Sequence, residues 1–295
     1  MHIRFKIQLN FNKAYMYSMK YNGLSFRSLS AYNISVAING DVLIYYPSDY
    51  STITYGDYYS VTSTGQPVLV KNSSVTAAIS AGITPKAVVF ALPSEMDATD
   101  KTKWPHAYAM ALKEAGSSIQ WSTSTSATVQ TSAHRYTTAT DAYADMGGYE
   151  ATHNITDKYS SSTYPAFFAA LNYDTTPTGS SGWFLPTNGQ WYKILVNLGG
   201  MSSGLTDARW SGATAATAAT NLNNYLNFNS SIATRFLRAD DSTERMYWCS
   251  GESNASHGCV ISFDNGGSMY CYYAPTKTVT TWEGGYLYAR ACIAF

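Results

Sequence analysis

The chain contains 295 residues, enough for one large domain or for a domain with a smaller unit attached. Its 19 basic residues balance 19 acidic residues, and only 13% of the chain is charged, which argues against nucleic acid or an anionic membrane surface as a partner. The 25 tyrosines exceed what core packing explains, because a buried phenol needs a hydrogen-bond partner. Tyrosine with Ser, Gly and Asn is typical of binding loops, although an ordinary tyrosine-rich β protein has the same composition.

The N-terminal segment predicts strands. Apolar and polar residues alternate over residues 3–11, and this stretch lacks the continuous apolar core of a signal peptide. Asn39-Gly40 between two alternating runs is typical of a tight hairpin. We therefore predict a small β unit over residues 1–60, which attaches a protein that is not Sec-exported to a larger assembly such as a virion. No run approaches the ~18 apolar residues of a membrane span, so we expect no membrane insertion.

Further β signals follow the N-terminal unit. Residues 58–70 have the pattern of a strand pair around Thr64-Gly65, and residues 86–92 that of a short buried strand. Residues 106–113 suit either a helix or a strand by propensity. The Ser- and Thr-rich stretch 117–140, which contains a single tryptophan, predicts a long surface loop.

Three helices are predicted in the second half of the chain. Pro165 stands at a suitable first position for a helix over residues 165–171. Thr187 is a good N-cap for a helix that ends at Gly199-Gly200. The Ala- and Thr-rich run 213–226 predicts the third helix.

The four cysteines all lie close to the C-terminus, at Cys249, Cys259, Cys271 and Cys292. They allow three disulfide connectivities, and they lack the paired short spacings of a zinc site. Because disulfides rarely persist where a chain without a signal peptide folds, we expect reduced thiols. The sequence gives no reason to expect a metal ion or a cofactor.

Two groups of residues carry a family resemblance. The first is Gly182-Trp183-Phe184-Leu185-Pro186-Thr187 with Gly189-Gln190-Trp191, and the second comprises Tyr247-Trp248, Ser250, Glu252, Phe263, Asn265-Gly266 and residues 290–295. The pattern resembles the C-type lectin-like domains of the DUF1566 and Fibrobacter major-paralogue type, over roughly residues 55–295. The resemblance implies an α+β, C-type lectin-like fold over residues 61–295, with small twisted antiparallel sheets, two helices and long loops, and it favours a strand over 106–113. Cys249, Cys259 and Gln190 depart from the family pattern.

The chain is also similar to the variable proteins of diversity-generating retroelements, phage receptor-binding proteins among them. In those proteins adenine-directed mutagenesis favours Asn, Ser, Tyr, Asp, Gly, His and Cys near the C-terminus. The resemblance implies a ligand-binding face formed by Ser253, Asn254, Ser256, His257, Cys259, Asp264, Asn265, Ser268, Tyr270, Tyr272 and Tyr273. The scaffold that it implies consists of Trp183, Leu185, Pro186, Trp191, Trp248, Glu252, Phe263, Gly266 and Phe295.

Together these features predict a non-enzymatic receptor-binding protein that displays a variable face on a phage virion, in a tail or head fibre. The expected partners are a host surface protein or glycan, the larger assembly reached through the N-terminal unit, and further copies of the chain in a homotrimer. A bacterial cell-surface or fimbrial adhesin is the alternative.

An enzyme is the third possibility. Leu185-Pro186-Thr187 resembles a motif that precedes a helix in formylglycine-generating oxidases, which share the fold class and need paired redox-active cysteines. The Asn-Val-Trp-Glu and Gly-Gly-Ser-Trp segments of those oxidases are missing, as are the Glu-Pro-Asn, Gln-Pro-Asp and Trp-Asn-Asp motifs of calcium-dependent lectins. Trp210 and Trp282 are each flanked by small polar residues and fit either stacking on a sugar ring or a buried anchor.

Overall fold

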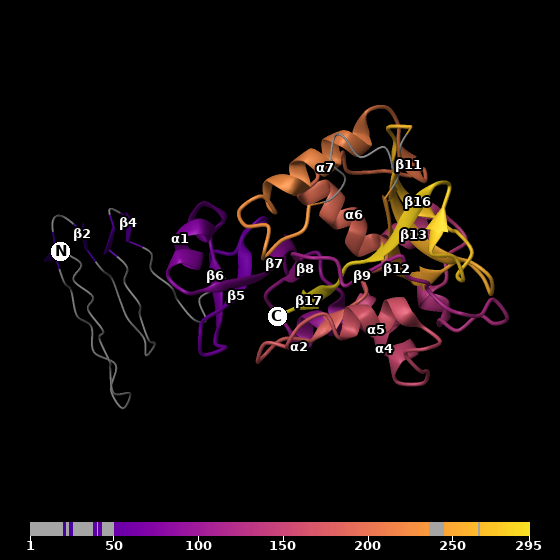
Figure 1. The fold of residues 1–295 in the computed structure, drawn as a ribbon, viewed down its shortest axis with the longest axis horizontal. Coiled ribbons are helices and arrows are strands. Elements are labelled where there is room, and N and C mark those ends of the chain that lie inside the picture. The colour runs from indigo at the N-terminus through magenta and orange to yellow at the C-terminus, as the bar shows by residue number, and fades with distance from the viewer. Residues whose placement is uncertain are drawn as a thin grey trace.

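The computed structural model describes residues 50–235, 245–264 and 266–295, together with four short strands nearer the N-terminus (Figure 1). These strands form two antiparallel pairs, β1 (Lys20–Tyr21) with β2 (Leu24–Ser25) and β3 (Ile38–Asn39) with β4 (Asp41–Val42). Ile38 lies opposite Val42, which agrees with the hairpin predicted around Asn39-Gly40. The strand predicted over residues 3–11 lies outside the described residues, and the attachment role of residues 1–60 stays a prediction.

Six strands form an antiparallel sheet in the order β10-β17-β8-β7-β5-β6. They are β5 (Tyr58–Val61), β6 (Pro67–Val70), β7 (Thr84–Ala91), β8 (Tyr108–Ala111), β10 (Trp183–Phe184) and β17 (Cys292–Ala294). The strand pair around Gly65, the buried strand at 86–92 and the strand over 106–113 are therefore confirmed. Since β5 is an inner strand of this sheet, residues 58–60 pair with strands of the second predicted unit.

A seven-stranded sheet contains the order β11-β14-β13-β12-β16-β15, with β9 paired to β16. Its strands are β9 (Gly116–Ser117), β11 (Arg209–Trp210), β12 (Arg245–Glu252), β13 (Gly258–Phe263), β14 (Met269–Tyr273), β15 (Thr281–Trp282) and β16 (Gly285–Ala289). All of its pairings are antiparallel except that of β12 with β16. The predicted ligand-binding residues fall on β13, β14 and the turns beside them.

The helices of the described residues are more numerous than the three predicted. They are α1 (Val75–Ser80), α2 (Ala98–Lys103), α3 (Ala139–Ala144), α4 (Gly148–Thr156), α5 (Pro165–Leu171), α6 (Asn188–Asn197) and α7 (Thr214–Asn224), with two short 3-10 helices at Asn72–Ser74 and Ser132–His134. The predicted helices correspond to α5, α6 and α7. In Figure 1, α6 and α7 lie together on one side of the molecule, and α4 and α5 lie together on the other.

Helix α6 begins where the sequence predicts it. The Thr187 hydroxyl accepts a hydrogen bond from the Gln190 N–H (3.2 Å), and the Gln190 side-chain oxygen accepts one from the Thr187 N–H (3.1 Å). This reciprocal pair is a capping box, which satisfies two N–H groups that the helix itself leaves without partners. Gln190 therefore performs the capping that a glutamate performs at this position, and its departure from the family pattern leaves the helix start intact.

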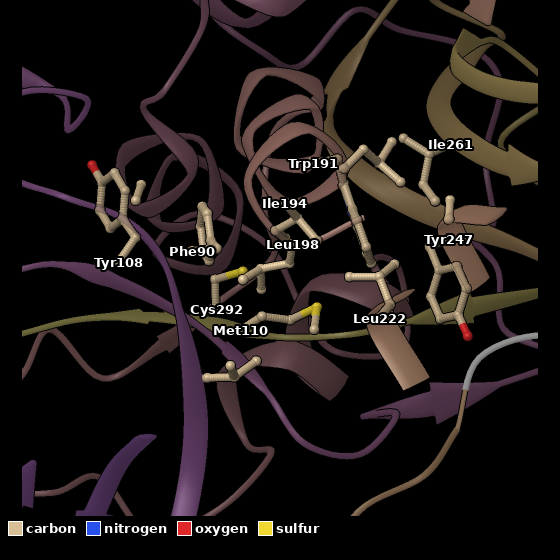
Figure 2. Packing of buried hydrophobic residues seen from close by; sticks show 14 of the residues in the cluster. Phe90, Tyr108, Met110, Trp191, Ile194, Leu198, Leu222, Tyr247, Ile261 and Cys292 are labelled. Carbon is tan, nitrogen blue, oxygen red and sulfur yellow. The ribbon is translucent and has the colours of Figure 1, made fainter. Parts of the chain in front are cut away.

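The main core lies where α6 packs between the two sheets (Figure 2). Trp191 and Ile194 of α6 are fully buried, and the same cluster contains Phe90 from β7 and Tyr247 and Ile261 from β12 and β13. A second cluster covers the opposite faces of both sheets and includes residues of α4 and α5. Both faces of the sheets are therefore buried over most of their area, which leaves little sheet surface for ligand contact.

The surface-loop prediction for residues 117–140 is wrong in part. Trp121 is fully buried, and its indole N–H donates to the Cys249 carbonyl (2.9 Å). Gln130 is also buried and donates to the carbonyls of Ser250 (2.8 Å) and Ala151 (2.9 Å). The Ser and Thr residues suggested exposure, but one large ring and one amide draw this segment onto the end of β12.

The described residues form a mixed α+β protein, which confirms the predicted fold class at that level. The C-type lectin-like assignment is finer than this and stays a prediction. Nowhere in residues 50–235, 245–264 and 266–295 does a helix have the length and apolar character that crossing a bilayer requires.

Candidate functional site

The predicted ligand-binding residues belong to the adjacent strands β13 and β14 and to the turns before each of them. One turn, residues 253–257, joins β12 to β13, and the other, residues 264–268, joins β13 to β14. Consecutive turns of an antiparallel meander lie at opposite ends of its strands. The predicted face therefore divides into two turns and the exposed side chains of β14.

The first turn contains four predicted residues. Asn254 Oδ1 accepts hydrogen bonds from the backbone N–H groups of Ser256 (2.9 Å) and His257 (3.1 Å), and the Ser253 N–H donates to the His257 carbonyl (3.0 Å). Such side-chain closure is what Asn contributes to turns. Asn254 is exposed and the other three are half-buried, so the turn offers a small polar surface that is already bonded internally.

The second turn, residues 264–268, is also closed by hydrogen bonds of its own. The Gly266 N–H donates to Asp264 Oδ1 (3.0 Å), and the Asp264 N–H donates to the Ser268 carbonyl (3.1 Å). Ser268 is only 8% exposed, so this residue does not belong to an open face. Gly266 is exposed, whereas the resemblance implies a scaffold position. Asn265 lies outside the described residues.

Cys259 is wrongly placed on the ligand-binding face by the sequence prediction. Its side chain has no exposed surface, and burial raises the pKa of its thiol. Cys249, Cys271 and Cys292 are also buried and free, and burial raises the pKa of each of these thiols. A buried thiol with a raised pKa is a poor nucleophile, so these residues act as small apolar side chains in the core.

Partly exposed aromatic rings of β14 and β15 lie close together on the seven-stranded sheet. We define the aromatic patch as Tyr270, Tyr273, Trp282, Arg209 and Glu283. The rings of Tyr270 and Tyr273 lie 5.8 Å apart, and the Trp282 indole N–H donates to the Tyr273 hydroxyl (3.0 Å). The three rings are half-buried, while Arg209 and Glu283 are exposed.

Polar groups hold the rings of the aromatic patch at both ends. The Arg209 guanidinium lies 5.2 Å from the Tyr270 ring centroid and donates to the Tyr270 hydroxyl. The Tyr273 hydroxyl donates to Glu283 Oε1 (3.0 Å). These contacts reduce the rotamer freedom that binding would otherwise have to remove. The patch thus combines partly exposed ring faces with one cationic and one anionic group.

Tyr272 does not join the aromatic patch. A register shift between β13 and β14 places Tyr273 opposite Val260 and Tyr270 opposite Ser262, which leaves one extra residue on β14 between these pairs. Tyr272 packs instead against the core cluster around α6, and its hydroxyl donates to the Tyr136 carbonyl (3.3 Å). The bulge thereby separates Tyr272 from the other two predicted tyrosines.

Glu283 occupies an unusual backbone conformation. Its φ is +49° and that of Gly284 is +85°, in the two-residue turn between Trp282 and Gly285. Two positive φ values define the hairpin turn that normally selects Asn, Asp or Gly at its first position. A glutamate there costs about 1 kcal/mol of backbone strain, and its side chain is the one that bonds Tyr273. Residues kept in strained conformations often serve a functional site.

A buried ion pair lies beneath the first turn, and the sequence did not predict it. We define the buried anchor as Glu252 and Lys277, whose carboxylate and ammonium lie 2.5 Å apart with side chains 0% and 1% exposed. Glu252 Oε1 also accepts from the backbone N–H groups of Val129 (2.9 Å) and Gln130 (3.0 Å). Lys277 Nζ lies 4.5 Å from the Trp121 ring centroid. Only proximity in the fold identifies Lys277, because 25 residues separate it from Glu252.

The implied scaffold residues other than Gly266 are all buried: Trp183, Leu185, Pro186, Trp191, Trp248, Glu252, Phe263 and Phe295. Trp210 is 7% exposed and stacks on Tyr192 at 5.8 Å, so its anchor role is the one observed, whereas Trp282 lies in the aromatic patch. Across the described ranges, no group of three or more His, Cys, Asp or Glu side chains has an arrangement that could hold a metal ion.

No family model matches this chain, and no curated protein matches it in sequence. A fimbrial protein from Bacteroides ovatus aligns with 82% of this chain at 15% identity and a TM-score of 0.48. This chain spans about half of that protein, 49% of its length. At this level a shared fold is not established.

Proposed function

We propose that this chain is a non-enzymatic recognition protein of the adhesin kind, which binds a component of another surface through the aromatic patch. The observation that carries the proposal is the cluster of Tyr270, Tyr273 and Trp282, whose rings are partly exposed yet fixed by hydrogen bonds. Tyr, Trp and Arg are the residue types that contribute most to binding energy at protein surfaces.

The chemistry of the aromatic patch suits a neutral or mixed ligand. Ring faces stack on sugar rings or apolar side chains, while Arg209 and Glu283 offer one donor group and one acceptor group at the margins. A host glycan or a surface protein both meet this description. The buried thiols and the lack of a redox-active pair at the surface weaken the formylglycine-generating alternative.

A bacterial cell surface or fimbria is the setting that we place first, and a phage tail or head fibre is the second. The virion setting relied in part on a retroelement-diversified face, and Cys259, one of the residues assigned to that face, is fully buried. Substitution at a buried position disturbs packing more than recognition, which weakens the case for the virion. The C-type lectin-like fold and the homotrimer remain parts of this proposal.

The experiment compares the full chain with a Tyr273→Ala/Trp282→Ala variant on a glycan array and on candidate host cells. We expect the double variant to lose at least ~30-fold in affinity, as removal of two central ring contacts implies. Tyr159→Ala is the matched control, because Tyr159 is 40% exposed and outside the aromatic patch. Equal binding by the double variant and the control would disprove the assignment of this surface.

A further inference from the structure

A second surface feature of the chain is a pocket of about 370 Å³ between α2 and α4. None of its lining residues belongs to the aromatic patch or the buried anchor. Its volume lies in the range of small-ligand pockets, ~300–1,000 Å³. The pocket is therefore large enough for a small molecule or a single long side chain.

The walls of this pocket carry more negative than positive charge. Four carboxylates line it, those of Asp97, Asp100, Glu150 and Asp157, against the two ammonium groups of Lys103 and Lys158. Lys158 Nζ bonds the Asn154 side chain, and Lys103 Nζ lies over aromatic rings, so within the described residues neither lysine is ion-paired to one of these carboxylates. Asp157 Oδ1 lies 3.1 Å from His153 Nδ1, which leaves Asp97, Asp100 and Glu150 as the pocket carboxylates without an ion-pair partner in the described part of the chain.

Asp100 is the most buried of the residues that line the pocket. It is 3% exposed, and its Oδ2 accepts from the Tyr108 hydroxyl at 2.6 Å, while Oδ1 accepts no hydrogen bond from the described residues. Burial raises the pKa of Asp100 to about 6, and the neighbouring charges of Asp97 and Glu150 add to this shift. A carboxylate so placed gains stability from any cation that enters the pocket.

The facing wall supplies an aromatic surface. The ring of Tyr149 lines the pocket and lies 4.4 Å from that of His153. Lys103 Nζ already lies 5.7 Å from the Tyr149 ring centroid, which shows that an ammonium group is accepted against this ring. Carboxylates from both helices and the Tyr149 ring therefore line the same pocket, and carboxylates beside a ring face form a usual environment for an organic ammonium group.

We propose that the pocket between α2 and α4 binds the ammonium group of an amine ligand, either a free alkylamine or a lysine side chain of a partner protein. The excess of carboxylates determines the sign of the ligand charge, and the Tyr149 ring favours an alkylammonium. A metal ion is disfavoured, because the His, Asp and Glu side chains in the described part of the chain form no group with metal-binding geometry. This inference is independent of the aromatic patch.

The probe for this proposal is 1,5-diaminopentane, titrated into the full chain by calorimetry and by saturation-transfer NMR at pH 7.5. We expect millimolar affinity that Asp100→Asn weakens at least ~10-fold, since a charge-assisted contact is worth about 1.5–3 kcal/mol. Asp174→Asn, at an exposed site distant in sequence and outside the pocket, makes the same charge change and should leave affinity unaltered. 1-Pentanol, which has the same chain length without the charge, should not bind.

Two further variants keep the test informative if Asp100→Asn disturbs the fold. Glu150→Gln alters an exposed residue, and Tyr149→Leu removes the ring. Each variant should bind 1,5-diaminopentane several-fold more weakly than the unaltered chain. Tighter binding of Nα-acetyl-lysine amide than of the diamine would identify a protein side chain as the occupant, and the reverse order a free amine. Two results would overturn the proposal. The first is that the diamine does not bind at 50-fold molar excess and ~50 mM amine, and the second is that Asp100→Asn and Asp174→Asn bind it with equal affinity.

Discussion

Two buried carboxylates in this protein have opposite surroundings. Glu252 in the buried anchor has an ammonium group at 2.5 Å and two backbone N–H groups at 2.9 and 3.0 Å. Asp100 in the pocket between α2 and α4 has one tyrosine hydroxyl at 2.6 Å and no ion-pair partner among the described residues. Both are almost fully removed from water, at 0% and 3% exposure.

The difference separates a structural charge from a charge available to a ligand. A buried carboxylate with its full set of partners is part of the fold, and removing one partner leaves an uncompensated charge. A buried carboxylate without a cation lowers stability at neutral pH, which a protein tolerates where the group serves another purpose. From this contrast we expect a loss of stability on substitution of Glu252, a gain of stability on substitution of Asp100, and a gain in amine affinity on substitution of Lys103.

The largest effect is expected at the buried anchor. Glu252→Gln leaves the Lys277 ammonium buried without its counter-charge, so we expect a loss of about 3–5 kcal/mol in the free energy of unfolding. Urea denaturation at pH 7 measures this loss. The double variant Glu252→Gln/Lys277→Met is the control, and it should be more stable than the single variant because no charge remains buried. If the single variant is as stable as the unaltered chain, the ion pair does not hold residues 127–130 on the sheet.

A smaller effect of opposite sign is expected at the pocket. Because the pKa of Asp100 is about 6 in the folded chain against 3.8 for the unperturbed group, the folded state binds more protons between those values, and stability falls as pH rises from 4 to 6. Asp100→Asn removes this loss while keeping an oxygen for Tyr108, so we expect a gain of ~3 kcal/mol in the free energy of unfolding at pH 7 and less than ~1 kcal/mol near pH 4. Urea denaturation across this range checks the difference. A constant offset between the two proteins would contradict it.

The smallest effect is expected at Lys103, which is exposed and lies over Trp104 and Tyr149 at 5.6 and 5.7 Å. Lys103→Gln should change stability by less than ~1 kcal/mol, since an exposed cation–π contact contributes little. The affinity for 1,5-diaminopentane should rise about two- to fivefold, because a competing positive charge is removed. Calorimetry on the two proteins measures this change, and weaker binding by the variant would count against the proposed ligand charge.

Local signals in the sequence predicted several elements well. Pro165 and the Thr187–Gln190 capping box act within one helical turn, so α5 and α6 begin where the sequence places them. Helices α1 to α4 were missed, because their short polar or Ala-rich segments lack a clear apolar period. Long-range packing stabilises such helices more than their own propensity does.

The sequence predicted the residue types of the candidate site better than the arrangement of those residues. Tyr270 and Tyr273 lie together with Trp282, as a tyrosine-rich binding surface requires. Tyr272 and Cys259 were placed on the same surface, but Cys259 is fully buried, and Tyr272 is half-buried and packs against the core cluster around α6. The orientation of these side chains depends on the extra residue at the β14 bulge and on the alternation of side chains along each strand. Both follow from the register of β13 with β14, which the sequence does not show.

By itself the sequence determined the α+β class, the start of α6 and the abundance of Tyr, Ser and Asn between residues 250 and 273. These features depend on contacts within a few residues or on composition. Only the tertiary structure decided which of those side chains face outward, joined Lys277 to Glu252, buried Trp121 and formed the pocket between α2 and α4. Each of these depends on strand register or on the packing of segments far apart in the chain, where loop closure and packing, and not local preference, determine which partners meet.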